Sequence, residues 1–588
     1  MRATLLPWGV AALCLAAGAA PAADPVDVEV DALRVVRDKS LPSFNLTVTV
    51  HNTGPEDQEL YVKEVRLKDT RDRVMQRIAV AARVPGLGRD WETLQPLLDL
   101  THDEISLRLA DREAERLLAH AAATEVEVSV PFETRAFVGA FAPGRKAEGV
   151  VEVDYEYGGQ AGSVTQDLAV DVEDLLLPLP PPAGAPPGRF ILGDTHVHST
   201  YSNCDSDKGR YPITQGAFNP HDQPDDLRSL YQDVGLQWIN VSDHCYCVSK
   251  GAFEDEATLA DAESSSSFLI IPGLEMSARE KVPDSTGQCV ANGHDTTHLN
   301  GIGLRPTDAL FAYTYDDGNR YACDARHVGR KAQLPFIQPA VLLLESLDNS
   351  RRGAVSLNHP GGTGLSGVAE PFNLTDAAFA CMDAPPETGL EVINSLWDVP
   401  QDGESVGHWI HQRLLRGHHV AAYGGSDTHR KKKTIGATFT GVLAESLDAN
   451  AARSVEDGLR RGRTFASTGP LVALWARPIA SPTWTEMGDT RTVTAASPVQ
   501  VHVAYSTGSR LVTVCLWLGR VGAQELQVPG SCRVQVSGND GYDVTLPALL
   551  PGESYVRAEA IGWFDFDGEL LLDGTYRAFA SPVWLEVR

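Results

Sequence analysis

Histidines and carboxylates adjoin short apolar runs at many points between residues 190 and 430. They are His196, His198, His244, Glu275, His298, His359, Glu391, Asp427 and His429. Imidazoles and carboxylates are good ligands for Zn, Mn and Fe. Burying so many ionisable groups beside apolar strands is unfavourable unless cations compensate them. The series therefore predicts a metal centre with more than one ion.

The strength of this prediction lies in the whole series. His196 and His198 are two residues apart, which on a strand places both rings on one face. With 17 histidines in 588 residues, however, chance alone supplies on the order of half such a pair. His294 lies four residues before His298 and is an alternative to it. We prefer His298 because it directly adjoins the apolar run HLNGIGL.

The elements that must position these residues change along the chain. Residues 1–23 read as a cleaved signal peptide. Alternating strands over 24–178 predict a β-sandwich, with an amphipathic helix at THDEISLRLADREAERLLAH. The proline-rich stretch at 179–188 predicts a linker. Strands alternate with helices over 189–470, which predicts a parallel sheet or barrel with its chemistry at the strand ends. Strands over 471–588 predict a second β-sandwich.

The order of the motifs resembles a known family. D-x-H-x-H-S-x-Y-S, S-D-H, P-G-x-E, H-x-x-G-x-G, N-H-P and G-G-S-D-x-H follow one another over roughly 190–470. This series is similar to the PHP (polymerase and histidinol phosphatase) superfamily of metal-dependent hydrolases. The stretch SVEDGLRRGRTFASTGP looks like the branch named after CehA and McbA. The resemblance implies a distorted (β/α)7 barrel, flanked here by the two β-sandwiches, with two or three divalent ions.

The resemblance also implies how the ligands are shared. His196, His198 and Asp427 hold the first metal, and Glu275 bridges it to a second metal held by His298 and His359. His244 and His429 hold the third. The family has a further ligand to the third metal shortly after H-x-H. This chain reads Ser202-Asn203-Cys204-Asp205 there, so the spacing departs from the pattern. Asp205 is our choice, with Cys204 as the alternative.

The implied mechanism is attack by a metal-bound hydroxide on a phosphoester, or on a carboxyl or carbamate ester. Asp427 and His429 are the candidate catalytic side chains beside this water. Arg279, Arg430 and Lys431 are candidates for binding an anionic substrate. The run Arg430–Lys433 is equally consistent with a solvated loop. Glu391 is either a ligand or a group that orients one.

Composition and charge narrow the class of protein. The net charge of −28 argues against general nucleic-acid binding. The signal peptide predicts a periplasmic or secreted protein. The rest of the sequence has no run of about 18 apolar residues, so we expect no membrane span. Eight cysteines outside the signal peptide are consistent with disulfides. The candidate pairs are Cys515 with Cys532 and Cys289 with Cys323. Cys245 and Cys247 are either buried or paired thiols, or groups beside the metal.

We therefore predict a secreted metal-dependent hydrolase of small-molecule esters. The alternative is a cell-envelope binding protein with a degenerate, non-catalytic barrel, which the altered Ser202–Asp205 segment favours. The sequence names neither the substrate nor the metal among Zn, Mn and Fe, and it leaves the oligomeric state open.

Overall fold

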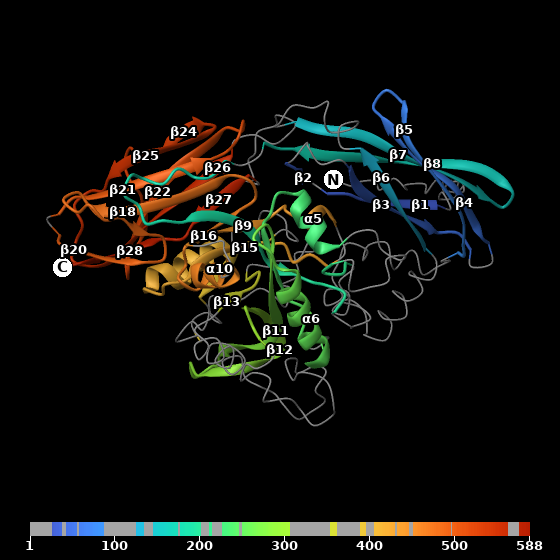
Figure 1. Ribbon diagram of the computed structural model, residues 1–588. Helices are drawn as coiled ribbons and strands as arrows, with labels where there is room; N and C mark the ends of the chain where they lie inside the picture. The colour runs from blue at the N-terminus through green and yellow to red at the C-terminus, as the bar shows by residue number, and fades with distance from the viewer. Residues whose placement is uncertain are drawn as a thin grey trace, which may run out of the picture.

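The chain is rich in β-strands, which form four sheets among the residues described by the computed structural model (Figure 1). The structure describes residues 26–33, 35–37, 43–55, 58–86, 125–133, 145–174, 177–201, 211–214, 226–245, 248, 250–305, 353–360, 381, 388–394, 405–429, 432–445, 451–495, 497–562 and 576–588. Within these ranges, the structure does not describe the side chains of 43–45, 131–133, 145–146, 250, 277–283 and 291–297. The helix expected at THDEISLRLADREAERLLAH lies outside the described residues.

The N-terminal strands form two sheets with a buried apolar core. One has the order β1-β3-β6 and the other β2-β8-β7-β4-β5. Leu60, Val62, Val65 and Leu67 of β4 are buried, and the alternation slips by one where a bulge interrupts pairing after Val62. The strands are β1 Val26–Asp31, β2 Val35–Val36, β3 Ser43–Asn52, β4 Leu60–Asp69, β5 Val74–Val84, β6 Glu125–Glu133, β7 Arg145–Tyr157 and β8 Gln160–Val172.

The middle of the chain supplies seven consecutive strands of a large sheet, in the order β9-β10-β11-β12-β13-β14-β15. Their neighbours pair in parallel except that β12 runs antiparallel to both β11 and β13. The strands are β9 Arg189–Val197, β10 Trp238–Val241, β11 Leu269–Pro283, β12 Cys289–Ile302, β13 Ala354–Leu357, β14 Gly389–Asn394 and β15 Ala421–Gly425. All parallel strands therefore end at one edge, and β12 begins there.

The two ends of this strand path meet. Val197 forms a parallel bridge with Thr428, just beyond β15. The His198 amide donates to the Thr428 carbonyl at 2.9 Å, and the Asp427 amide donates to the His196 carbonyl at 2.9 Å. The residues that follow β15 thus lie beside the end of β9. Side chains at the ends of strands far apart in sequence are brought close together in this way.

Helices accompany the middle strands. They are α5 Leu227–Asp233, α6 Lys250–Glu263, α10 Ala451–Arg460, the π-helix η4 Trp409–Arg413, and the 3-10 turns η5 Leu414–Arg416 and η6 Lys432–Thr434. Asp226 begins α5 because its side chain accepts a hydrogen bond from the Ser229 amide at 2.7 Å. The helices α5 and α6 lie along the green part of the chain in Figure 1.

The C-terminal strands form a four-stranded sheet, β19-β18-β21-β25, and continue the large sheet through β9-β16-β17-β27-β26-β22-β23. The large sheet therefore contains strands from both sides of the boundary predicted near 470. The strands are β16 Phe439–Ala444, β17 Thr464–Ser467, β18 Leu471–Pro478, β19 Thr485–Glu486, β20 Thr490–Val493, β21 Val499–Ser506, β22 Val512–Arg520, β23 Glu525–Gln527, β24 Arg533–Val536, β25 Asn539–Thr545, β26 Gly552–Gly562, β27 Arg577–Ala580 and β28 Val583–Val587.

Two disulfides link described cysteines. Cys515 pairs with Cys532, as predicted. Cys289 pairs with Cys381 and not with Cys323, so that prediction is wrong. The error has a simple cause: which cysteines meet depends on tertiary folding, and spacing along the chain does not determine it. Cys245 is buried.

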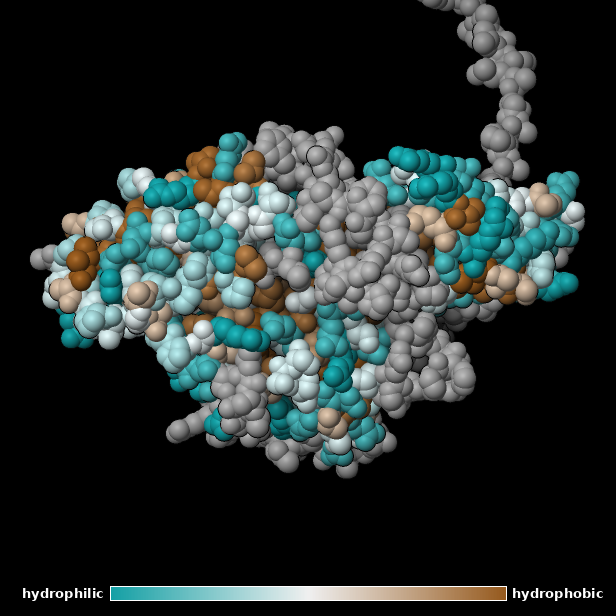
Figure 2. Space-filling model, turned by 45° about the horizontal axis from the view of Figure 1, so that its top comes forward, coloured by the Kyte–Doolittle hydropathy of each residue, from teal (hydrophilic) through white to brown (hydrophobic). Residues whose placement is uncertain are grey.

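On the face that Figure 2 shows, the described surface is largely polar, and apolar side chains reach it in separate groups. Leu550, Val534 and Leu526 are the most exposed large apolar side chains of the described part, and all three lie outside the middle strands. Among the described helices, none has the length and apolar character needed to cross a membrane.

Candidate metal centre

Every parallel strand from β9 to β15 contributes a candidate ligand or ligand partner within the strand or directly after it. The contributing residues are His196 in β9 and His198 directly after it, His244 after β10, Glu275 in β11 just beyond the part that pairs with β10, His359 after β13, Glu391 in β14, and Asp427 and His429 after β15. His298 comes from β12, whose reversed direction carries this residue to the same edge. It pairs with Ser277, two residues beyond Glu275. The structure therefore brings these side chains together from strands far apart in sequence.

The carboxylate of Glu275 lies at the centre of the cluster, and its two oxygens face different histidines. Oε1 lies 3.0 Å from Nδ1 of His298 and 3.2 Å from Nε2 of His196. Oε2 lies 2.8 Å from Nδ1 of His244 and 3.4 Å from Nε2 of His198. Glu275 is buried with 1% of its surface exposed. A carboxylate that faces two groups of imidazoles with separate oxygens has the arrangement of a bridging ligand.

Asp427 forms a second centre of contacts on the other side of the same histidines. Its Oδ1 lies 3.1 Å from Nε2 of His198, 3.3 Å from Nε2 of His196 and 3.4 Å from Nδ1 of His429. Asp427 has a φ of 51° and His359 has a φ of 25°. Both lie in or near the left-handed region, which a non-glycine residue adopts at a cost of order 1–3 kcal/mol and which is concentrated at functional sites.

Whether these residues fit a cation can be judged from two pairs of imidazole nitrogens that lie close together. Nε2 of His196 lies 3.1 Å from Nε2 of His198, and Nε2 of His244 lies 3.1 Å from Nε2 of His429. Nδ1 of His429 faces the Asp427 carbonyl at 3.1 Å. Because a carbonyl only accepts hydrogen bonds, Nδ1 carries the proton and Nε2 of neutral His429 presents a lone pair.

The same reasoning applies to His196, whose Nδ1 faces the Glu391 carboxylate at 3.0 Å. Its Nε2 then points at His198, Glu275 and Asp427. Converging lone pairs and carboxylates require a proton or a cation between them. Two nitrogens bound at about 2.05 Å to one tetrahedral zinc ion lie about 3.3 Å apart. The residues present therefore fit a divalent metal.

Four overlapping triplets have ligand atoms that all lie within 4.8 Å of one another. They are His198/His244/His429, His196/His198/Glu275, His196/His359/Asp427 and Glu275/His298/His359. The last triplet contains the residues expected to hold the second metal. The first contains the two residues expected at the third metal together with His198. The role of these residues as metal ligands stays a prediction.

The electrostatics of the metal-free cluster follow from burial and mutual contact. Burial alone would raise the pKa of Glu275, but His298, His196 and His244 hold that pKa well below its ordinary value. Burial would lower the pKa of His196, yet Asp427, Glu275 and Glu391 raise it well above its ordinary value. Burial, and then His429 and His244, lower the pKa of His198 well below its usual range. The carboxylate of Glu275 is therefore ionised and faces the protonated imidazole of His196, from which a metal would displace the proton.

Polar residues behind the cluster hold the ligands in place. Glu391 accepts from the His359 amide at 3.0 Å with the oxygen that does not face His196. Asn358 donates to Oε1 of Glu275 at 2.8 Å. Oδ1 of Asp194 accepts from the amides of His196 and Ser426, each at 3.0 Å. Glu391 thus contacts both His196 and His359, and its role as a ligand or as a group that orients one stays a prediction.

The sequence analysis assigned no role to Asp194 or Asn358, although Asp194 begins the motif D-x-H-x-H and Asn358 begins the motif N-H-P. The signal was their position: Asp194 precedes His196 by two residues, and Asn358 directly precedes His359. Burial raises the pKa of Asp194 to about 6, while hydrogen bonds from Ser426, His196 and Tyr231 favour its ionised form. Such partners fix the orientation of metal ligands in known sites.

Several predicted site residues lie outside the described part. Asp205, Arg430 and Lys431 are not described, nor is the side chain of Arg279. His294 shares the strand β12 with His298, but its side chain is likewise not described. Lys432 is fully buried, so the solvated-loop interpretation of the run Arg430–Lys433 is wrong at this residue. The amides of Lys432 and Lys433 face the buried carboxylate of Asp31, which holds this part of the run against the N-terminal strands.

Comparison with known proteins leaves the family open. No family model matches the sequence, and no curated protein matches it. Solved structures match at low TM-scores, which carry no argument about fold. The β-glucuronidase of Parabacteroides merdae has a TM-score of 0.16 at 10% identity and covers 96% of this chain and 65% of that one. A transglutaminase of red sea bream has a TM-score of 0.16 at 10% identity, with coverage of 29% and 20%. This chain spans less than two thirds of either protein.

Gly425 offers a test of the orienting contact behind His196. A Cβ at this position would lie 2.3 Å from Oε1 of Glu391 and 2.7 Å from Cβ of His196. Both neighbours are buried, so Gly425→Ala must displace them. We expect metal affinity to fall by roughly 10–100-fold, the usual effect of losing a partner that orients a ligand. Equilibrium metal titration measures this.

Gly251 provides the matched control, because a Cβ there meets nothing within 4 Å. It lies in α6, where alanine favours helix over glycine by about 1 kcal/mol. Gly251→Ala is expected to leave metal affinity unchanged. Equal affinities for Gly425→Ala and the wild type would contradict the orienting role of Glu391.

Proposed function

We propose that this protein is a secreted or periplasmic metal-dependent hydrolase of phosphoesters or of carboxyl or carbamate esters. One observation carries the proposal: the two oxygens of buried Glu275 face separate groups of imidazoles, with Asp427 across the same cluster. Two or three divalent ions, Zn, Mn or Fe, fit this donor set. His196, His198, Glu275 and Asp427 would hold the first, Glu275, His298 and His359 the second, and His198, His244 and His429 the third.

We further propose that the strands β9 to β15 form the distorted (β/α)7 barrel of the PHP superfamily. The bridge between Val197 and Thr428 supports closure, since it joins the first strand to the residues after the last. The ligands at the carboxyl ends of the strands support it too, because active sites of such barrels lie at that edge. The assignment to the CehA and McbA branch rests on the sequence resemblance alone.

Divalent ions in such a site supply a water that is deprotonated near neutral pH, and they polarise the bond under attack. The chain's own residues determine where this takes place. His429 is the most exposed ligand, with 14% of its side chain accessible against 7% or less for Asp427, His244, His298 and His359. The greater exposure of His429 supports an approach of the substrate from its side, with His429 and the adjacent Asp427 as the candidate side chains beside the reacting group.

The alternative is a binding protein with a degenerate, non-catalytic barrel. A site that has lost its activity usually loses several ligands, whereas every predicted ligand that lies in the described part of the chain contacts another member of the cluster. The altered segment at Asp205 is the feature that favours this alternative. Both proposals involve a small-molecule ligand, so metal content separates them better than binding does.

The test combines metal analysis with a substrate panel. Purified protein is analysed for bound metal, then assayed on an aryl phosphate, a phosphodiester, a carboxylester and a carbamate. We expect two or more equivalents of metal and turnover of one class, with both absent in His196→Ala. Less than one equivalent would support the binding-protein alternative. Metal-loaded protein without turnover of any class would contradict the proposed range of substrates.

A further inference from the structure

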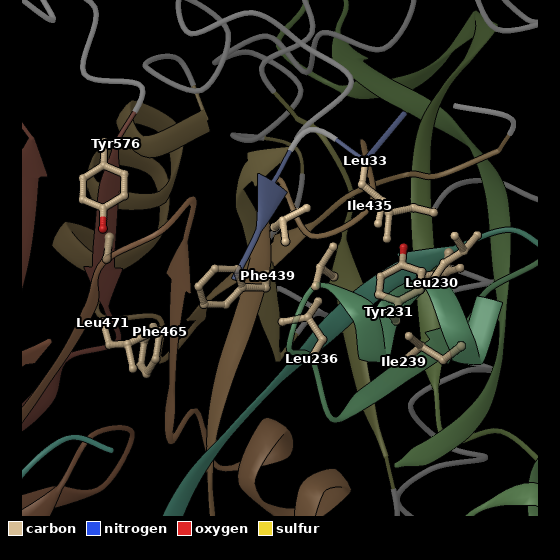
Figure 3. Close-up of a cluster of buried hydrophobic side chains, with 14 of the residues drawn as sticks. Leu33, Leu230, Tyr231, Leu236, Ile239, Ile435, Phe439, Phe465, Leu471 and Tyr576 are labelled. Carbon is tan, nitrogen blue, oxygen red and sulfur yellow. The ribbon is translucent and has the colours of Figure 1, made fainter. Parts of the chain in front are cut away.

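The N-terminal strands reach the loop that follows the ligand His429. Asp31, the last residue of β1, is buried, and its Oδ2 accepts a hydrogen bond from the Lys432 amide at 2.9 Å. Its Oδ1 accepts from the Lys433 amide at 3.4 Å. Leu33 and Ile435 belong to one buried cluster, and Figure 3 draws them next to each other.

Arg37 holds the other end of this loop. Its guanidinium donates to the Gly436 carbonyl at 3.4 Å and to the Val234 carbonyl at 3.1 Å, and pairs with Glu173 at 2.9 Å. Arg37 is buried, so these charge-assisted contacts are shielded from water. Asp31 and Arg37 therefore fix the loop at residues 432–433 and at residue 436.

A chain of hydroxyl groups connects this loop to the ligands. The hydroxyl of Thr434 lies 2.8 Å from that of Thr428, which lies 2.7 Å from that of Ser426. Asp427 lies between Ser426 and Thr428, and His429 follows Thr428. Asp427 and His429 thus belong to a segment, residues 426–429, that is hydrogen-bonded to the loop through Thr434.

The charge of the loop explains why an acid is needed there. Arg430, Lys431, Lys432 and Lys433 are consecutive cations that precede the contact with Ile435. The fully buried Lys432 has lost its hydration, and Lys433 adds a like charge next to it. The carboxylate of Asp31 offsets this cost because it accepts from the backbone at Lys432 and Lys433.

We infer that Asp31 is a positioning residue of the metal centre, and that the N-terminal strands are required for His429 to complete the His198/His244/His429 triplet. The statement about the metal rests on the proposed function. The statement about the loop does not, because it concerns contacts within the chain alone.

The test compares Asp31→Ala, Asp31→Asn and the control Asp69→Ala in the full chain. Asp69 also accepts from backbone amides, those of Arg71 and Arg73 at 2.9 Å, but within the N-terminal turn between β4 and β5. Hydrogen exchange of peptides covering residues 424–436 is measured by mass spectrometry after chelation of metals. Zinc equivalents are then measured after reconstitution with zinc alone.

Losing hydrogen bonds to a charged acceptor is expected to accelerate exchange about tenfold or more in Asp31→Ala, at residues 426–429 as well as 432–436. The variant should bind one zinc equivalent less than the wild type, whereas Asp31→Asn, which keeps an acceptor oxygen, should retain most of the binding. Asp69→Ala should match the wild type in both measurements. These results would support the inference, because they would show a local effect of Asp31 and no change in global folding.

Two outcomes would overturn the inference. One is faster exchange confined to residues 432–433, because the contact would then not reach the ligands. The other is wild-type zinc content in Asp31→Ala. A wild-type chain that binds no zinc would contradict the proposed function instead, and the exchange measurement would still decide the role of Asp31.

Discussion

Glu275→Gln is expected to remove at least two equivalents of metal and to lower turnover on the order of 10³-fold, more than the 10–100-fold typical for a partner outside the ligand set. The substitution keeps the size of the side chain but removes the charge that faces His196, His198, His244, His298 and His359. An amide also presents one acceptor oxygen where the carboxylate presents two. Metal analysis and steady-state kinetics measure the two losses.

The control for this substitution is Glu263→Gln. Glu263 pairs with Arg228 at 3.0 Å near the surface, where an ion pair contributes about 0–1 kcal/mol. We expect its metal content and turnover to equal those of the wild type. Full metal content in Glu275→Gln would refute a bridging role for Glu275 and, with it, the sharing of ligands among neighbouring ions.

The site was more predictable than the fold, because its signals are local. Each ligand stands beside an apolar run short enough to be a strand, and strands of one direction end at one edge of a sheet. His298 differs from the others, since it precedes its apolar run. The structure explains this, because β12 is the strand that runs in the opposite direction among the seven. The order of ligand and run had therefore already indicated the reversed strand.

Contacts between distant segments could not be predicted in the same way. Cys289 meets Cys381, which is 92 residues away along the chain, while Cys323 looked equally suitable by spacing. Lys432 belongs to a run of cations that resembles a solvated loop, yet it is buried near Asp31, about 400 positions earlier in the sequence. Neither pattern carries information about its partner. The N-terminal strands accordingly seemed to have no part in the site.

Backbone conformation at the ligands was equally hidden from the sequence. Asp427 and His359 have φ values of 51° and 25°. No local signal marks them, since glycine, the residue that ordinarily marks such a conformation, is absent from both positions. If both residues hold a metal as proposed, that requirement outweighs the preference of the backbone. This allows charge and conformation at Asp427 to be separated experimentally.

Asp427→Asn is expected to lower turnover on the order of 10³-fold and to weaken metal binding. It should also destabilise the metal-free protein, in which the Asp427 charge raises the pKa of buried His196. Asparagine adopts left-handed backbone at least as readily as aspartate, so the substitution changes charge without adding strain. Asp427→Ala should have the same effect on turnover, and its free energy of unfolding should be lower than that of Asp427→Asn by roughly 1–2 kcal/mol, the cost of a left-handed residue with an ordinary side chain. Denaturant unfolding in chelator measures that difference.

Asp72 supplies a control with the same chemistry and the same backbone. It has a φ of 62° in the turn between β4 and β5, and its exposed carboxylate contacts Lys68. Asp72→Ala should therefore be less stable than Asp72→Asn by the same roughly 1–2 kcal/mol that separates Asp427→Ala from Asp427→Asn, while both Asp72 variants keep full turnover. If Asp427→Asn also kept full turnover, Asp427 would be needed only for its backbone shape. Its charge, which lies beside His196, His198 and His429, would then have no part in holding a cation.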